Sequence, residues 1–275
     1  MRSFTKSAAL CSVLSVLTLS LPLSAQEKPK LYNTAKQKLL DGKQVFSHTV
    51  STFDPEAYCE AAKHYDYTWF EMQHATLTFA DIEKMILTCP KAGAIPMIRM
   101  ADELESSIQH ATDIGCLGIV MPTVDTVEKA LQTAKYARYP PVGRRSQGRN
   151  NGAAIWGANY RQTFNDNMLV IVMIETPTGV ANAYEIAKVP GIDVVILGNS
   201  DLTNFSGFLP NDPRYQQMLV DVRDATLKAG KFYGNANANL AKDNPISKDS
   251  RFHQNGPSND GWQPPARGGR VPTKK

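Results

Sequence analysis

Short apolar runs alternate with amphipathic stretches along most of this chain. Runs of β-favouring residues predict seven strands, at residues 44–50, 67–70, 95–100, 118–121, 169–174, 193–197 and 231–234. Apolar residues at helical spacing predict helices between them, at residues 36–40, 55–63, 79–88, 104–114, 126–135, 180–187 and 215–229. Unbroken apolar strands are typical of a sheet covered on both faces. The alternation therefore predicts a parallel α/β fold.

The positions of the polar side chains favour a closed barrel over an open sheet. Candidate functional residues follow strands two, three, five and six, and a barrel collects all strand ends at one mouth. An open sheet would gather them near one switch point, and no Gly-x-Gly-x-x-Gly turn follows the first strand. We expect a TIM (β/α)8 barrel over residues 26–245 and an irregular Gly/Pro-rich tail over 246–275. The eighth unit is atypical, since residues 250–253 resemble a remnant strand and no helical pattern follows Trp262.

The first 25 residues have the layout of a secretory signal peptide. Arg2 and Lys6 precede an apolar run, and small residues end it at Ala25. The alternative is a retained anchor, but the run is short for a membrane span. We expect an exported protein, periplasmic or secreted, without stable membrane insertion once the signal is cleaved. Of the mature cysteines Cys59, Cys89 and Cys116, one pair could form a disulfide there, and the sequence does not select the pair.

Composition excludes some classes of partner. The net charge of +4 is modest and the basic residues do not gather on one helix face, so we expect no nucleic-acid partner.

Residues 139–167 form a long segment rich in Gly, Pro, Arg and Asn, which we interpret as a lid or a binding loop.

Two carboxylates follow neighbouring apolar strands. Glu175 ends the strand at 169–174, and Asp201 lies just beyond the strand at 193–197. Parallel strand ends meet at one rim, and carboxylates suit a hard divalent ion such as Mg²⁺ or Mn²⁺. The alternative is structural: Glu175 would cap the next helix and Asp201 would make a turn hydrogen bond.

Three further side chains are candidates for chemistry. His74 follows the second strand and could act as a general base, although a lone histidine is more often structural. Arg99 ends the third strand and could stabilise an enolate oxygen, or only pair with Glu71 or Glu175. Arg145 in the long loop could bind an anionic substrate, or belong to a solvated basic turn.

The order of these motifs resembles the HpcH/HpaI aldolase/citrate lyase family, metal-dependent class II pyruvate aldolases on a TIM barrel, of the 2,4-dihydroxyhept-2-ene-1,7-dioate aldolase type. The matching stretches are Phe70–Ala75, Pro96–Arg99, Asp113–Gly115, Val120–Pro122, Arg138–Gly143, Ile174–Thr176 and Gly198–Leu202. They occur in family order across roughly residues 31–244.

The resemblance implies a role for each candidate. Glu175 and Asp201 are similar to the family's ligands for Mg²⁺, Mn²⁺ or Co²⁺, and His74 to its base. Arg99 is similar to the arginine that stabilises the enolate, and Asp113 to the acid paired with the histidine.

The resemblance also implies how substrate binds. The backbone around Gly198 and Ser200 would hold the carboxylate of a 2-oxo acid. Asp113 ends the helix after strand three, at the barrel face opposite the mouth, so it would serve the histidine of a neighbouring subunit. We therefore expect a homo-oligomer.

These roles predict a divalent-metal-dependent carbon–carbon lyase that cleaves or forms 4-hydroxy-2-oxo acids from pyruvate and an aldehyde. A related acyl- or malate-type lyase is the second hypothesis. The third is a non-catalytic, exported 2-oxo acid binding protein. It is motivated by Gln73 and Met173, which stand where the family usually carries an acidic residue and a glutamine.

Overall fold

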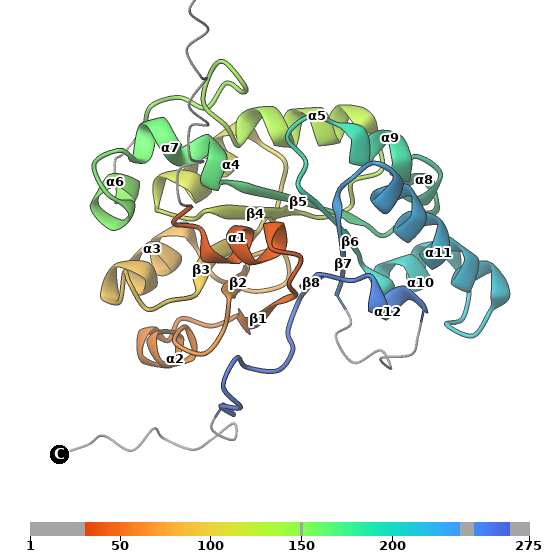
Figure 1. Cartoon of the computed structure of the whole chain (residues 1–275), viewed down its shortest axis with the longest axis horizontal. Helices are drawn as coiled ribbons and strands as arrows, with labels where there is room; N and C mark the ends of the chain where they lie inside the picture. The colour runs from red at the N-terminus through yellow and green to blue at the C-terminus, as the bar shows by residue number, and fades with distance from the viewer. Residues whose placement is uncertain (1–30, 149–150, 237–244, 265–275) are drawn as a thin grey trace, which may run out of the picture. The chain divides into compact units, whose positions relative to one another are not determined.

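The computed structural model describes residues 31–148, 151–236 and 245–264. Eight parallel strands close into a barrel in sequence order, with helices around them (Figure 1). The closure is complete because β8 pairs with both β7 and β1. The predicted TIM barrel is confirmed. The strands are β1 (Val45–Val50), β2 (Tyr67–Glu71), β3 (Ile95–Arg99), β4 (Gly118–Met121), β5 (Leu169–Ile174), β6 (Val194–Leu197), β7 (Phe232–Asn235) and β8 (Phe252–His253).

Helices follow the strands in the alternating order that the apolar spacing predicts. Several begin at a side-chain cap; Thr78, for example, forms a capping box with Asp81. The helices in the described part of the chain are α1 (Thr34–Leu40), α2 (Pro55–Ala61), α3 (Phe79–Thr88), α4 (Glu105–Asp113), α5 (Val127–Tyr136), α6 (Asn151–Trp156), α7 (Tyr160–Asn167), α8 (Pro177–Ala181), α9 (Ala183–Lys188), α10 (Asn199–Ser206), α11 (Pro213–Lys228) and α12 (Pro245–Lys248).

The eighth unit is short and lies beyond the predicted end of the barrel. β8 has two residues, and it falls in the segment that the sequence assigned to the tail. The boundary at residue 245 is therefore too early, because the barrel is complete only at His253. From there to Pro264 the described chain has no helix. This segment packs against the turn between α2 and β2 instead, where Trp262 stacks on His64 with ring centroids 4.7 Å apart.

Residues 139–167 do not form a lid. They contain α6 and α7, which lie at the end of the barrel where the strands begin. There Trp156 donates a hydrogen bond to the Gly115 carbonyl, just ahead of β4, and α7 leads directly into β5. Tyr160 and Phe164 are one helical turn apart and both are buried. This apolar pair is the helical signal that the Gly- and Arg-rich composition obscured.

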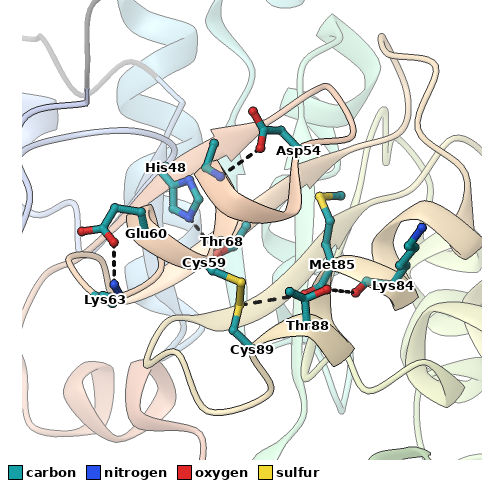
Figure 2. Close-up of a disulfide and its surroundings, with 11 residues drawn as sticks. His48, Asp54, Cys59, Glu60, Lys63, Thr68, Lys84, Met85, Thr88 and Cys89 are labelled. Carbon is teal, nitrogen blue, oxygen red and sulfur yellow. Dashed lines mark hydrogen bonds and ion pairs between the residues drawn. A yellow bond between two sulfur atoms is a disulfide. The ribbon is translucent and has the colours of Figure 1, made fainter. Parts of the chain in front are cut away.

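A disulfide joins two helices on the outside of the barrel. Cys59 of α2 is bonded to Cys89, which caps α3, with Cα atoms 5.8 Å apart (Figure 2). Cys116 is free and buried. The structure thus selects one pair among the three cysteines, a choice that the sequence left open.

The predicted signal peptide at residues 1–25 lies outside the described residues. Within the described ranges, no helix has the length and apolar character that crossing a bilayer requires.

Candidate active site

Arg99 lies among three carboxylates at the carboxyl ends of the strands. Its Nη1 is 3.4 Å from Glu71 Oε2, and its Nη2 is 3.9 Å from both Glu175 Oε2 and Asp201 Oδ2. Glu71 and Arg99 end β2 and β3, whereas Glu175 and Asp201 follow β5 and β6, so four strand ends contribute to one mouth. Arg99 is only 6% exposed. A buried guanidinium offers fixed donors to an anion that enters this mouth.

Glu175 has two carboxylate oxygens in different environments. Oε1 accepts hydrogen bonds from the backbone N–H and the hydroxyl of Thr123, at 2.7 and 2.9 Å. Oε2 is buried and accepts no hydrogen bond from the described residues. Burial raises the pKa of Glu175 above its usual value, while the Thr123 hydroxyl and Arg99 act in the opposite direction. A cation bound at Oε2 would therefore stabilise the ionised form of Glu175.

Gly198 provides the space for that carboxylate. It follows β6, and its N–H donates to the carbonyl of Ile174, one residue before Glu175. A Cβ at this position would lie 2.1 Å from Glu175 Oε2, far inside contact distance. Any residue could adopt the φ of −95° at this position. Glycine is therefore needed for the close approach of Glu175 and not for its backbone conformation.

Glu71 holds the end of β2 and Arg99 together. Its Oε2 accepts from Trp69 Nε1 at 3.1 Å as well as from Arg99. Its Oε1 accepts from the backbone N–H groups of Gln73 and His74, at 2.9 and 3.1 Å. These bonds fix the turn that carries His74, whose side chain is exposed.

Asp201 and Ser200 lie in the first turn of α10, which begins directly after Gly198. The first N–H groups of a helix have no acceptor within the helix and favour a negative charge. Ser200 is exposed, and the Asp201 side chain is 39% exposed. A substrate anion could therefore reach this helix end from solvent.

Arg145 and Asp113 are brought together, but not with the residues of the mouth. Arg145 Nη2 is 2.7 Å from Asp113 Oδ1, at the end of α4, which lies at the barrel face opposite the mouth. The Arg145 side chain is fully buried, with its guanidinium 4.4 and 4.3 Å from the ring centroids of Tyr139 and Phe164. The expectation that Arg145 binds substrate is wrong for this chain, because its charge is already satisfied inside the packing of α4 and α7.

Thr123 and Glu71 are further contact residues of the site. The sequence named Glu71 only as a possible partner of Arg99 and did not indicate Thr123 at all. Glu71 ends a strand, so the rule that identified Glu175 applies to it equally. Thr123 had no comparable signal, since a hydroxyl residue two positions beyond β4 is common in turns.

The barrel and its mouth match a known family. The family model described as HpcH/HpaI aldolase/citrate lyase matches residues 56–245. This range includes Glu71, Arg99, Glu175 and Asp201. The chain belongs to the HpcH/HpaI aldolase/citrate lyase family.

Two relatives that this chain resembles over most of its length are aldolases. The 2-keto-3-deoxy-L-rhamnonate aldolase of Shigella sonnei (strain Ss046) is 32% identical over 210 residues, covering 74% of this chain and 79% of that protein. The 2-dehydro-3,6-dideoxy-6-sulfogluconate aldolase of Pseudomonas putida is 31% identical over 184 residues, covering 66% and 71%. The crystal structure of an HpcH/HpaI aldolase from Desulfitobacterium hafniense DCB-2 has a TM-score of 0.72 at 26% identity, covering 80% of this chain and 90% of that one. The resemblance read from the motifs is confirmed.

Two residues of the family stretch have unusual surroundings. Gln73 Oε1 is buried and accepts no hydrogen bond from any described residue. Met173 is 2% exposed and points to the same side of β5 as Glu175, two residues later. Met173 therefore contributes an apolar side chain on the Glu175 side of β5.

Proposed function

We propose that this protein is a divalent-metal-dependent aldolase, which cleaves or forms 4-hydroxy-2-oxo acids from pyruvate and an aldehyde. The observation that carries the proposal is the convergence of Arg99, Glu175 and Asp201 at one mouth of the barrel. Two similar aldolases are named for acids deoxygenated next to a 2-oxo group, which supports this class of substrate.

The donors at the mouth fit a hard divalent cation. Glu175 Oε2 is a buried oxygen without a hydrogen-bond partner, and Asp201 Oδ2 lies within 3.9 Å of the same arginine nitrogen. Among the described residues no three His, Cys, Asp or Glu side chains form a metal cluster, so Glu175 and Asp201 would be the two protein ligands. Two carboxylates leave positions for substrate, as Mg²⁺ or Mn²⁺ sites commonly do. Bound there, Mg²⁺, Mn²⁺ or Co²⁺ would polarise the 2-oxo group as a Lewis acid.

The chain's own residues would bind the substrate and stabilise charge. The N-terminal turn of α10, with Gly198 and Ser200, would bind the carboxylate of the 2-oxo acid. In the cleavage direction the C3–C4 bond breaks, the C4 hydroxyl loses its proton and C4 becomes the aldehyde. The electron pair of that bond passes to the pyruvate enolate, whose oxygen would accept hydrogen bonds from Arg99.

His74 would remove the proton from the C4 hydroxyl, directly or through water, and a proton returned to C3 of the enolate would give pyruvate. Its exposed ring extends from a turn that Glu71 fixes, so the ring can turn toward a bound substrate. Asp113 ends α4 at the opposite face, and in a homo-oligomer it would serve the histidine of another subunit.

The test is release of pyruvate from a 4-hydroxy-2-oxo acid by the purified protein with Mg²⁺, Mn²⁺ or Co²⁺. Glu175→Gln should reduce turnover at least about 100-fold, because it removes one of only two ionic ligands. Glu185→Gln, at an exposed carboxylate of α9, should leave turnover unchanged. No pyruvate with any of the three ions, and no change in melting on adding them, would contradict the proposal.

A second function is favoured by the apolar Met173 on the Glu175 side of β5 and by Gln73 Oε1, which accepts no hydrogen bond from the described residues. A non-catalytic 2-oxo acid binding protein would keep the metal and the anion site and lose proton transfer. Titration calorimetry distinguishes the two: saturable pyruvate binding with Mn²⁺ and no turnover of any 4-hydroxy-2-oxo acid would favour the binder.

We also propose that the protein is exported. The pattern of residues 1–25 supports a cleaved signal, and a disulfide between Cys59 and Cys89 suits an oxidising compartment. N-terminal sequencing of the protein recovered from a bacterial periplasm or medium should begin near Gln26. An intact Met1 with both thiols open to alkylation would refute export.

A further inference from the structure

Thr123 has a backbone conformation that its side chain disfavours. It lies in the loop after β4 with φ of +51°, and in the described chain only one other non-glycine residue, Asn255, has a positive φ. Asparagine adopts this region readily, whereas a β-branched residue there is a genuine outlier. Such strain persists where the surrounding structure fixes it, often at a functional site.

The strained conformation aims two donors at one oxygen. The Thr123 N–H and hydroxyl both donate to Glu175 Oε1, at 2.7 and 2.9 Å. The next residue anchors the loop beside β5, since the Val124 N–H donates to the Met173 carbonyl at 2.9 Å. In this conformation Thr123 presents both donors to the same oxygen.

The other oxygen of Glu175 is kept free by packing. Oε2 accepts no hydrogen bond from the described residues, and it lies so close to Gly198 that a Cβ there would be 2.1 Å away. With Oε1 held by Thr123, the carboxylate has no freedom to turn both oxygens toward the mouth. Arg99 Nη2 lies 3.9 Å from Oε2 and equally far from Asp201 Oδ2, so Oε2 is the oxygen of Glu175 on the side of the mouth.

We propose that Thr123 is a positioning residue, which reserves Oε1 of Glu175 for the protein and leaves Oε2 as a one-oxygen ligand for a divalent cation. The inference rests on the proposed function only in taking Glu175 as a metal ligand. It adds a selectivity: a carboxylate limited to one oxygen suits the small octahedral ions Mg²⁺ and Mn²⁺, and disfavours Ca²⁺, which commonly binds carboxylates through both oxygens.

The experiment compares Mn²⁺ and Ca²⁺ binding by titration calorimetry of the purified full chain, stripped of metal beforehand. Thr123→Val keeps the shape and the N–H and removes the hydroxyl. It should weaken Mn²⁺ binding about 10-fold or more, the usual effect of losing a residue that orients a ligand, and narrow the preference for Mn²⁺ over Ca²⁺. Thr123→Ser should restore both values. Thr178→Val, at an exposed threonine of α8, is the matched control and should change neither.

Melting of the metal-free protein separates positioning from folding. Thr123→Val should still unfold cooperatively, because Val and Thr share the same shape and strain, and the lost hydrogen bond to a buried carboxylate should lower the melting temperature by no more than about 8 °C. Unchanged Mn²⁺ and Ca²⁺ affinities in Thr123→Val would overturn the inference, and so would a serine variant as weak as the valine variant. A parent that binds no Mn²⁺ would overturn it together with the proposed metal site. If the parent binds Mn²⁺, if Thr123→Val weakens that binding, and if the parent releases no pyruvate, only the proposed activity is refuted.

Discussion

Arg99 shows how one residue can determine the character of the mouth. Its guanidinium is the counter-charge for Glu71, Glu175 and Asp201, the first two of which are almost fully buried. Carboxylates this close repel one another, and removing a buried partner leaves charge without compensation. In the metal-free protein Arg99 therefore has a structural role, in addition to the role in enolate stabilisation proposed above.

Arg99→Met should lower the free energy of unfolding of the metal-free protein by about 3 kcal/mol. Urea denaturation with a chelator present measures this. Adding Glu71→Gln to Arg99→Met should recover part of the loss, because one of the unpaired charges is then removed. Equal stability of parent and Arg99→Met would show that the guanidinium contributes nothing without metal.

His48 gives the protein a specific acid sensitivity. It lies on the outer side of β1, with Nε2 2.9 Å from Thr68 Oγ1, and borders a cavity of about 420 Å³ beside α2. Burial lowers the pKa of His48 to about 4. Between that value and about 6.5 the unfolded chain binds more protons at this residue than the folded chain, so stability rises with pH through this window and is lost as pH falls.

The loss between pH 7 and pH 4 should be at most about 3 kcal/mol for His48. The carboxylates of Asp54 and Glu60 border the same cavity and would reduce the loss by stabilising the imidazolium. Urea denaturation of parent and His48→Gln over this range isolates the effect, since glutamine does not titrate. Parallel stability curves for the two proteins would contradict it.

Sequence reasoning located Arg99, Glu175 and Asp201 well, because a strand end determined the position of each. Glu175 and Asp201 converge with Arg99 as expected, because parallel strands in a barrel bring their ends together. Arg145 was misplaced because its position depends on how α7 packs under α4, which no local pattern reveals. Thr123 was missed because its significance lies in a φ angle and two hydrogen bonds.

Among the elements, the long apolar strands were the easiest to predict. β5 is buried at every position, so its sequence carries an unbroken apolar signal. α6 and α7 were taken for a loop because Gly, Asn and Arg dilute their short apolar faces. β8 was recognised only as a remnant, since two residues carry almost no periodicity.

The disulfide between α2 and α3 should make a measurable contribution to stability. Cys59 and Cys89 are 30 residues apart in sequence, and closing a loop of that length stabilises the folded state by about 3 to 4 kcal/mol in the chain-entropy model. Cys59→Ser, Cys89→Ser and the double variant should each lose about this amount in urea denaturation, because either change opens the same bond. Additive losses in the double variant would show that the cysteines contribute as separate packed side chains.

At the scale of the whole molecule, a very short strand completes the barrel. β8 supplies Phe252, which is fully buried and stacks on Tyr67 with ring centroids 4.6 Å apart. The Tyr67 hydroxyl donates to the His253 carbonyl at 2.6 Å, and the Val45 N–H to the Arg251 carbonyl at 2.8 Å. Without these contacts β1 and β7 would be open edges beside an exposed apolar interior.

Truncation should therefore show that the barrel ends at His253, and not at residue 245 as the composition indicates. A chain ending at Asn244 loses β8 and should show no cooperative urea transition. A chain ending at Pro264 retains every contact that β8 makes with the described residues and should unfold within about 1 kcal/mol of the full chain. Phe252→Ala in the full chain provides a milder test and should cost about 3 to 5 kcal/mol, because it empties a buried aromatic site. A cooperative, parent-like transition in the chain ending at Asn244 would show that seven strands suffice for a stable barrel, and that Phe252 and His253 are not needed to close it.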